Sequence, residues 1–416
     1  MTDTERALRR ASWCCATGVV WMMALCHCAG VREPGRERIA RARAGKGDIT
    51  IAAAWPWELR KEIRYGEGLQ MAMEEVNAEG GVAGRRLRLV RYDDKESIDE
   101  GRLVAQRIAQ DPDVVAVIGH LQSYITVQAA RVYDQAGLVL MAPTATAPDL
   151  TEQGFTRVFR ATFTDETVGS QLADLAAARR LGSVGILYIR NTYGRNVANA
   201  FEMRAAQLGI RIAIRDSYDP SEQADARSFE RILRVWKNQE IDVIMLAGEV
   251  PSAAIFVSQA RAQGIEVPIL GGDAMSSPGL MAVAGRAAEG MIVASFFHPD
   301  EPRQETARFV AAFQRRYGVA ADAGSALGYD CVRVIARAMK QAGSVAPDDV
   351  AVALRTLAVN EGVTGTFRFD SHGEMVAKPI VMSIVRDGRF NYLAPVSSRP
   401  VRTSSEPSTG FAPPRS

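Results

Sequence analysis

Short runs of consecutive apolar residues alternate with longer amphipathic stretches along the middle of the chain. The runs are rich in aliphatic residues and predict strands at 49–54, 87–92, 114–119, 138–142, 184–189, 210–214, 243–247, 268–270 and 291–294. The stretches between them predict helices, among them 65–77, 98–110, 125–135, 167–181, 195–208, 228–237 and 252–263. Strands that are apolar throughout suit parallel sheets covered on both faces, and their alternation with helices is typical of βαβ units. We therefore predict an α/β protein of two lobes, because one small open sheet does not comfortably hold this many strands.

Composition and charge fit a globular protein that does not bind nucleic acid. The 416 residues are 47% hydrophobic and 24% charged, which excludes a wholly disordered or collagen-like chain. The net charge of +2 is unevenly divided, because residues 1–47 hold nine basic and four acidic side chains and residues 398–416 hold three and one. The body between them is left with 38 basic and 43 acidic side chains. An acidic body argues against a polyanionic partner.

Residues 1–30 have the pattern of a bacterial export signal. Three arginines precede an apolar run at 11–28, and a basic segment followed by an apolar one directs export. The run ends in LCHCAG, which resembles a lipoprotein signal and predicts a lipid anchor on Cys28, with Cys26 as the alternative. An ordinary cleaved signal and a retained membrane anchor stay open as other interpretations. The predicted location is the periplasm or the cell surface.

The flanking segments and the remaining cysteine add little chemistry. Residues 31–47, rich in Arg, Gly and Ala, predict a flexible tether, and the Ser- and Pro-rich residues 396–416 predict a disordered tail. Cys331 is the one cysteine beyond the signal, so it has no partner for a disulfide within the body. We expect it to be a buried packing residue.

No pattern in the sequence favours an enzyme. No glycine-rich phosphate loop and no nucleophile elbow follows a predicted strand. The four histidines are scattered and indicate no metal site. We predict a binding protein without cofactor or metal, and an enzyme on the same fold is the least favoured alternative.

Small hydroxyl residues and acidic residues stand directly after predicted strands. Ser123, Thr144 and Thr146 follow two strands of the first half, at helix starts that favour a carboxylate. Glu249 and Asp273 follow two strands of the second half and could accept an ammonium group. Ligands of open α/β sheets bind at the carboxyl ends of strands, so we expect a zwitterion that bridges two lobes. Each residue taken singly also fits a plain helix cap.

A series of short segments occurs in the order typical of one family. They include GLQMAMEEVNAEGGVAGRRL at 68–87, APTATAPDLT at 142–151, NTYG at 191–194, GGD at 271–273 and ALGYD at 326–330. From about residue 49 to about residue 390, this series resembles the type I periplasmic solute-binding proteins of ABC transporters, in the Leu/Ile/Val-binding branch. The resemblance implies two doubly wound α/β lobes with three crossovers and a ligand cleft between them. Lobe 1 would comprise 48–164 plus 295–370, and lobe 2 would comprise 165–294 plus 371–395.

The resemblance also implies a function and a site. The expected function is capture of a small amino-acid-like ligand, a branched-chain amino acid or a related amide or carboxylate, by hinge closure and delivery to an ABC permease. A ligand sensor that signals through a membrane partner without transport is the alternative. For the ligand carboxylate, the matching positions are Ser123, Thr146 and the backbone of Thr144. For the ammonium, the matching position is Asp273, helped by groups near Glu249, and Asp165 matches a position beside the cleft at the first crossover.

The loop after the first strand departs from the family pattern. Relatives carry a small residue, a hydroxyl residue, Gly and Pro there, whereas this chain has Trp55 and Trp57 on either side of Pro56. The two indoles would either line the cleft and stack on the ligand, or fold outward as a plug. The two cysteines that often form a bridge in branched-chain relatives are absent near Glu96 and Gln122.

Overall fold

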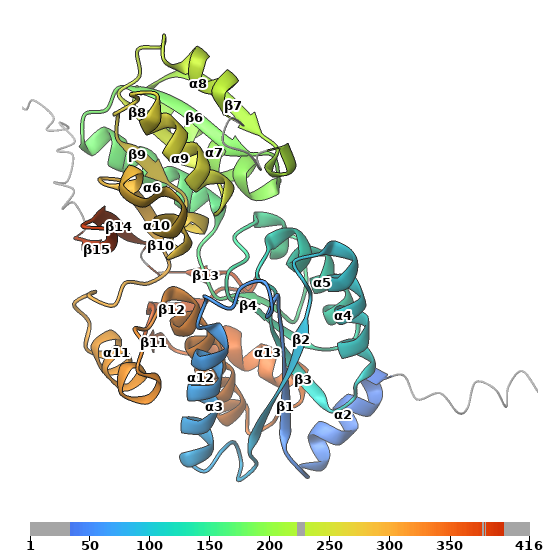
Figure 1. Cartoon of the computed structure of the whole chain (residues 1–416). Coiled ribbons are helices and arrows are strands. Elements are labelled where there is room, and N and C mark those ends of the chain that lie inside the picture. The colour runs from blue at the N-terminus through green and yellow to red at the C-terminus, as the bar shows by residue number, and fades with distance from the viewer. Residues whose placement is uncertain (1–33, 223–228, 377, 379, 395–416) are drawn as a thin grey trace, which may run out of the picture.

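Two sheets, one in each lobe, organise the chain (Figure 1). The computed structural model describes residues 34–222, 229–376, 378 and 380–394. The predicted export signal with Cys26 and Cys28, and the predicted tail at 396–416, lie outside the described residues. The prediction of two doubly wound α/β lobes is confirmed.

Lobe 1 is built on five parallel strands in the order β2-β1-β3-β4-β5. Their bounds are β1 (Ile49–Trp55), β2 (Leu87–Asp93), β3 (Val114–Gly119), β4 (Val139–Ala142) and β5 (Val158–Arg160). The helices of this lobe are α2 (Pro34–Ala44), α3 (Tyr65–Ala78), α4 (Ile98–Gln110), α5 (Ser123–Gln135), α11 (Gln304–Tyr317), α12 (Ala323–Ala342) and α13 (Pro347–Thr356).

Lobe 1 explains why its inner strands β1, β3 and β4 are apolar at nearly every position. Ile51 and Ala53 of β1 belong to the core with α3 and α12, whereas Ala52 and Ala54 belong to a second core with α4 and α5. Successive side chains of a strand point to opposite faces of a sheet, so a strand covered by helices on both sides has no polar face. Cys331 of α12 is fully buried in the first of these cores and unpaired, as predicted.

Lobe 2 is built on seven strands in the order β15-β14-β10-β9-β8-β6-β7. β14 runs antiparallel to both of its neighbours, β10 and β15. Their bounds are β6 (Ser183–Ile189), β7 (Arg211–Tyr218), β8 (Val243–Ala247), β9 (Ile269–Gly271), β10 (Ile292–Ser295), β14 (Val381–Arg386) and β15 (Arg389–Leu393). The helices are α6 (Asp165–Ala178), α7 (Thr192–Gln207), α8 (Glu230–Trp236), α9 (Ser252–Ala262) and α10 (Gly279–Ala284). Short 3₁₀ turns are η1 (Pro148–Leu150) in lobe 1, and η2 (Pro220–Glu222), η3 (Asp273–Met275) and η4 (Gly285–Ala288) in lobe 2.

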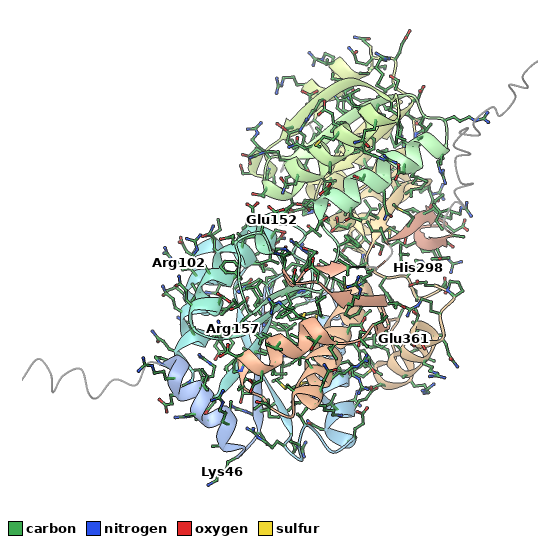
Figure 2. All side chains as sticks on the ribbon, turned by 180° about the vertical axis from the view of Figure 1, so that it is seen from behind. Lys46, Arg102, Glu152, Arg157, His298 and Glu361 are labelled. Carbon is green, nitrogen blue, oxygen red and sulfur yellow. The ribbon has the colours of Figure 1, made fainter. Side chains whose placement is uncertain are left out.

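The chain passes between the lobes three times. It crosses from β5 to α6, and again from β10 to α11, where His298 lies near the junction of the lobes (Figure 2). A small antiparallel sheet of β11 (Asn360–Gly362), β12 (Gly365–Phe369) and β13 (Met375–Val376) precedes the third crossing. The boundary predicted after residue 370 is therefore placed too early, because β13 still pairs with β12 and Met375 still packs in the core of lobe 1.

The segment predicted to be a flexible tether is helical from Pro34 to Ala44. The side chain of Arg38 is fully buried and donates hydrogen bonds to the carbonyl oxygens of Val114 at 2.6 Å, Ala109 at 2.8 Å and Asp111 at 3.0 Å. These carbonyls lie near the end of α4 and the start of β3, so one guanidinium satisfies several buried acceptors of lobe 1. The prediction of a flexible tether is wrong for these residues. Hydrogen bonds from Arg38 hold α2 against lobe 1, and the sequence shows no apolar stripe that would have indicated this contact.

Candidate functional site

The carboxyl ends of strands from both lobes enclose a cavity between the lobes. Residues that follow β3 and β4 in lobe 1 face residues that follow β8 and β9 in lobe 2, around a volume of about 110 Å³. Open α/β sheets bind their ligands at this position. The cavity is lined by Arg60, Glu62, Ile63, Leu121, Gln122, Ser123, Thr144, Thr146, Tyr193, Glu249, Val250, Asp273, Ala274, Ser277 and Phe296.

The structure brings most of the predicted ligand residues to this cavity. Those that line it are Ser123, Thr144, Thr146, Glu249 and Asp273, which come from both lobes. Asp165 lies behind the lining, and Trp55 and Trp57 lie elsewhere in lobe 1.

Ser123 joins the two loops of lobe 1 that face the cavity. It begins α5, and its Oγ accepts hydrogen bonds from the backbone N–H of Thr146 at 3.1 Å and of Ala147 at 3.4 Å. The first turn of a helix carries unpaired N–H groups and the positive end of the helix dipole. The hydroxyl therefore lies at a position that favours a bound anion.

Thr144 lines the cavity from the loop after β4. Its hydroxyl donates to the carbonyl oxygen of Leu121 at 2.7 Å, with that of His120 at 3.3 Å, so the side chain is engaged with the neighbouring loop. Within the described part of the chain, no protein group accepts a hydrogen bond from the Thr144 N–H. That N–H has no partner among these residues, at the position where the resemblance implies a backbone contact to the ligand carboxylate.

Asp273 provides a buried acid on the lobe 2 side. Its Oδ1 accepts a hydrogen bond from the hydroxyl of Tyr193 at 3.2 Å, and that hydroxyl oxygen accepts one from the backbone N–H of Ala274 at 3.3 Å. Burial, together with the nearby charge of Asp165, raises the pKa of Asp273 to about 7. A cation that enters the cavity would favour the ionised form of this carboxyl.

A glycine makes the approach of Tyr193 to Asp273 possible. A Cβ on Gly272 would lie 2.3 Å from the hydroxyl oxygen of Tyr193, closer than any real side chain allows. Gly272 directly precedes the acid and so leaves the space that the tyrosine fills.

Glu249 adds a second carboxylate of lobe 2. Its Oε1 accepts a hydrogen bond from the side-chain amide of Asn191 at 2.8 Å, and burial raises the pKa of Glu249 above its usual range. Across the cavity, Arg60 donates two hydrogen bonds to Glu96, at 2.7 and 3.1 Å. The lining thus combines acidic groups with one guanidinium that is already paired.

Asp165 supports the site from behind. It is fully buried at the start of α6, accepts a hydrogen bond from the side chain of Asn196 at 3.0 Å and donates its N–H to the carbonyl of Thr146 at 2.9 Å. Burial raises the pKa of Asp165 to about 6, against the lowering effect of hydrogen bonds from Thr146 and Asn196. It contacts the ligand loop without lining the cavity.

The two tryptophans pack within lobe 1. Trp55 is 1% exposed and stacks on Tyr65 with ring centroids 3.9 Å apart. Trp57 donates from its indole N–H to the carbonyl of Tyr92 at 3.0 Å and lies under the guanidinium of Arg91. Neither interpretation of this loop holds as stated, because the indoles stay out of the cavity but Trp55 is buried in the core of lobe 1 and does not fold outward as a plug.

Arg60 and Tyr193 line the cavity but were not among the predicted ligand residues. Tyr193 lies in the NTYG segment directly after β6, so its place at a strand end was a usable signal. Arg60 lies in a loop without periodicity, and its direction is set by Glu96, which is distant in sequence. No sequence signal identified that pair.

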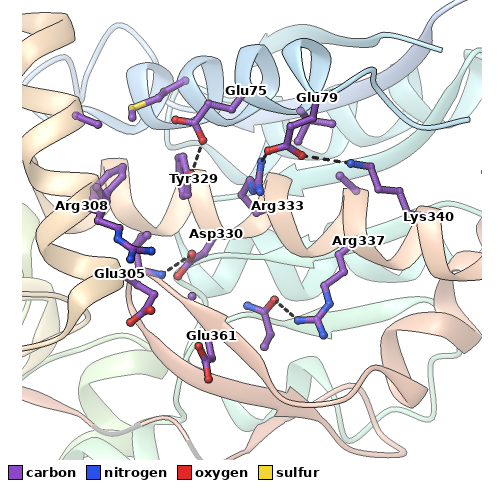
Figure 3. Close-up of a pocket in the computed structure, with 18 residues that line it drawn as sticks. Glu75, Glu79, Glu305, Arg308, Tyr329, Asp330, Arg333, Arg337, Lys340 and Glu361 are labelled. Atoms are coloured by element: carbon purple, nitrogen blue, oxygen red, sulfur yellow. Dashed lines mark hydrogen bonds and ion pairs between the residues drawn. The ribbon is translucent and has the colours of Figure 1, made fainter. Parts of the chain in front are cut away.

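A larger hollow lies on lobe 1, outside the cavity between the lobes (Figure 3). It measures about 540 Å³ and is lined by residues of α3, α11, α12 and β11. Two of its basic groups are engaged by one acid, since Glu79 accepts hydrogen bonds from Arg333 at 2.6 Å and from Lys340 at 3.3 Å. We place the candidate site in the smaller cavity, because there the strand ends of both lobes meet.

The described residues provide neither a metal-binding cluster nor a membrane-spanning helix. No group of three or more acidic, histidine or cysteine side chains there is arranged to hold a metal ion. None of the helices in the described segments has both the length and the apolar character that a membrane crossing requires.

Curated relatives with amino-acid-binding names match most of the chain. Leu/Ile/Val-binding protein homolog 1 of Brucella abortus is 28% identical over 333 residues, which cover 79% of this chain and 87% of the relative. The leucine-, isoleucine-, valine-, threonine-, and alanine-binding protein of Pseudomonas aeruginosa is 28% identical over 332 residues, with the same two coverages.

Solved structures and a family model agree with these relatives. An ABC transporter substrate-binding protein of Desulfitobacterium hafniense in complex with Leu is 37% identical with a TM-score of 0.76, over 83% of this chain and all of the other. A leucine-binding protein of Thermotoga maritima is 27% identical with a TM-score of 0.77, over 83% and 98% of the two chains. The model of the family described as periplasmic binding protein matches residues 63–389. The predicted resemblance is confirmed, and the chain belongs to the type I periplasmic binding proteins, in the family of the Leu/Ile/Val-binding proteins.

Proposed function

We propose that this protein captures a small α-amino acid outside the cytoplasm and delivers it to an ABC permease. The observation that carries the proposal is the division of the cavity between the lobes. Ser123, Thr144 and Thr146 of lobe 1 offer hydrogen-bond donors, and Asp273 of lobe 2 offers a carboxylate. A free amino acid has a carboxylate for the first set and an ammonium for the second. Membership of a family of solute-binding proteins, which bind without catalysis, supports a transport role.

Closure of the two lobes follows from this division. A ligand stabilises the closed state only as far as it binds that state better than the open one. An amino acid whose carboxylate lies on lobe 1 and whose ammonium lies on lobe 2 makes its full set of contacts only when the lobes approach. The three crossovers are the hinge about which this motion is expected.

The residues that line the cavity specify the side chain of the ligand less narrowly than its α-carboxylate and α-ammonium groups. The relatives named above bind leucine or other small amino acids. Here the lining combines apolar residues such as Leu121 and Phe296 with the polar Arg60, Gln122 and Glu249. The proposed ligand class therefore extends from branched-chain amino acids to those with an amide or other polar side chain.

The membrane attachment is a separate part of the proposal. We propose a lipid anchor on Cys28, which would hold the protein close to its permease. Metabolic labelling with a palmitate analogue should mark the wild-type protein and the Cys26→Ser variant but leave Cys28→Ser unlabelled. Label retained by Cys28→Ser would contradict this assignment.

The binding test uses the purified body after ligand has been removed by unfolding and refolding. Leucine, glutamine and lysine are titrated by calorimetry and thermal melting, with acetate and butylamine as controls that carry only one of the two charges. A bound amino acid at about 100 times its Kd adds about 2.7 kcal/mol to the free energy of unfolding, whereas neither control should shift the melting temperature. Failure of every amino acid tested to bind would refute the proposal.

Transport is tested in cells. Deletion of the gene should abolish uptake of the labelled amino acid that binds in calorimetry, and the wild-type gene should restore it. Tight binding combined with unchanged uptake would favour the sensor.

A further inference from the structure

The hydroxyl of Ser123 has both of its acceptor positions occupied by the protein. The backbone N–H groups of Thr146 and Ala147 donate to it at 3.1 and 3.4 Å. A serine hydroxyl has one hydrogen to donate and two lone pairs to accept with. The one function that remains for a ligand is donation of the hydroxyl hydrogen.

The two peptide groups that occupy Ser123 are anchored from their other side. The carbonyl of Ala145 accepts a hydrogen bond from Nη1 of Arg160 at 2.6 Å, and the carbonyl of Thr146 accepts one from the N–H of Asp165 at 2.9 Å. In a planar trans peptide the carbonyl and the following N–H point in opposite directions. Because each carbonyl is held at the back of the loop, the N–H groups of Thr146 and Ala147 are turned toward Ser123.

Arg160 is built into this loop more deeply than a surface arginine. Its side chain is fully buried at the end of β5, and Nη2 also donates to the carbonyl of Ala147 at 2.8 Å and to the hydroxyl of Thr151 at 3.1 Å. Its charge is balanced by Glu374, whose Oε2 accepts a hydrogen bond from Nε at 2.9 Å. A guanidinium presents its donors in a rigid plane, so it fixes several acceptors at once.

We propose that Arg160 is a positioning residue that makes Ser123 a hydrogen-bond donor only, and so selects a ligand carboxylate against the corresponding carboxamide. The inference rests on the proposed α-amino-acid ligand. A carboxylate accepts at both oxygens, from Ser123 and from the free N–H of Thr144. A carboxamide has one accepting oxygen, and its NH₂ group would meet a donor with no acceptor to receive it.

The selectivity test compares L-leucine with L-leucinamide at pH 7. The variant Arg160→Gln/Glu374→Gln removes both charges of the buried pair, since loss of one alone would leave the other uncompensated. The matched control Arg157→Gln/Asp348→Asn removes another ion pair of lobe 1 whose Arg–Asp distance is 2.5 Å. We expect the variant to bind leucine about tenfold to a hundredfold more weakly and leucinamide nearly as before, while the control keeps both affinities.

The ratio of the two affinities separates positioning from general damage. A variant whose affinity falls by the same factor for leucine and for leucinamide keeps the wild-type ratio of affinities, and this result would overturn the proposal. If the double variant does not fold, Arg160→Lys keeps the charge beside Glu374 but cannot span the same acceptors, and its ratio is interpreted in the same way.

A measurement without ligand tests the geometry directly. Amide hydrogen exchange in the peptide that contains Thr146 and Ala147 should be at least tenfold faster in Arg160→Gln/Glu374→Gln than in wild type. It should be unchanged in the control Arg157→Gln/Asp348→Asn. Unchanged exchange in the variant would overturn the positioning role. Failure of the wild-type protein to bind any of leucine, glutamine and lysine would instead refute the proposed function, and exchange would still decide the role of Arg160.

Discussion

Replacement of Asp273 by Asn should stabilise the empty protein while it removes ligand binding. Asn has nearly the same shape and can still accept the hydrogen bond from Tyr193, but it never ionises. In the native protein the pKa of Asp273 rises from 3.8 to about 7, chiefly through burial. The acid form is therefore favoured by folding, and this contribution is present below pH 4 and lost as the pH rises through 7. Above pH 7 the ionised group costs the empty protein on the order of 4 kcal/mol, since one pKa unit is worth 1.36 kcal/mol.

The pH dependence isolates this effect from other consequences of the substitution. Between pH 5 and pH 8 the cost of ionised Asp273 grows by about 2–3 kcal/mol, whereas a buried amide left without an acceptor costs a similar amount at either pH. Urea denaturation of ligand-free protein at the two values gives the free energy of unfolding. The advantage of Asp273→Asn over wild type should grow by about 2–3 kcal/mol from pH 5 to pH 8.

The control is Asp99→Asn, at a side chain that is 84% exposed. Its difference from wild type should be nearly flat with pH. A difference for Asp273→Asn that is also flat within about 0.5 kcal/mol would refute the reasoning that burial strains this acid. The same variant should bind leucine at least a hundredfold more weakly by calorimetry, because the ligand ammonium loses its buried counter-charge.

Three further changes test the same site. Leucine should bind about tenfold more weakly at pH 6 than at pH 8, because the ammonium requires ionised Asp273, and binding should release about one proton to the buffer at pH 6 but almost none at pH 8. Affinity independent of pH in this interval would contradict the assignment of Asp273. Ser123→Ala removes the donor to the ligand carboxylate and leaves two N–H groups without an acceptor, so calorimetry should give at least a tenfold loss of affinity, and unchanged affinity would argue for a plain helix cap. Tyr193→Phe removes the hydrogen bond to Asp273, so the midpoint of the pH–affinity curve should move upward, and a midpoint that stays in place would show that this bond does not tune the acid.

The sequence predicted those parts of the fold that local patterns determine. The bounds of β3, β8 and α4 agree with the predicted ones because their apolar spacing is unambiguous. β5 was missed because three residues carry too little pattern. α2 was missed because its stability depends on the carbonyls that Arg38 finds in lobe 1, which no local pattern reveals.

The candidate site was predictable to the extent that it follows topology. Ser123 and Asp273 come directly after strands, and the carboxyl ends of parallel strands meet at one edge. The direction of a side chain in a loop depends on its tertiary partners. Arg60 lines the cavity beside Glu96, whereas Trp55 leaves it to stack on Tyr65, and neither contact is local in the sequence.

A crystal structure of the protein with its bound amino acid would test the central claim most directly. We expect the ligand carboxylate to contact the Ser123 hydroxyl and the Thr144 N–H, and the ammonium to contact the Asp273 carboxylate, so that one molecule bridges both lobes. A ligand bound in the opposite orientation, on one lobe alone, or in the larger hollow beside α12 would contradict it.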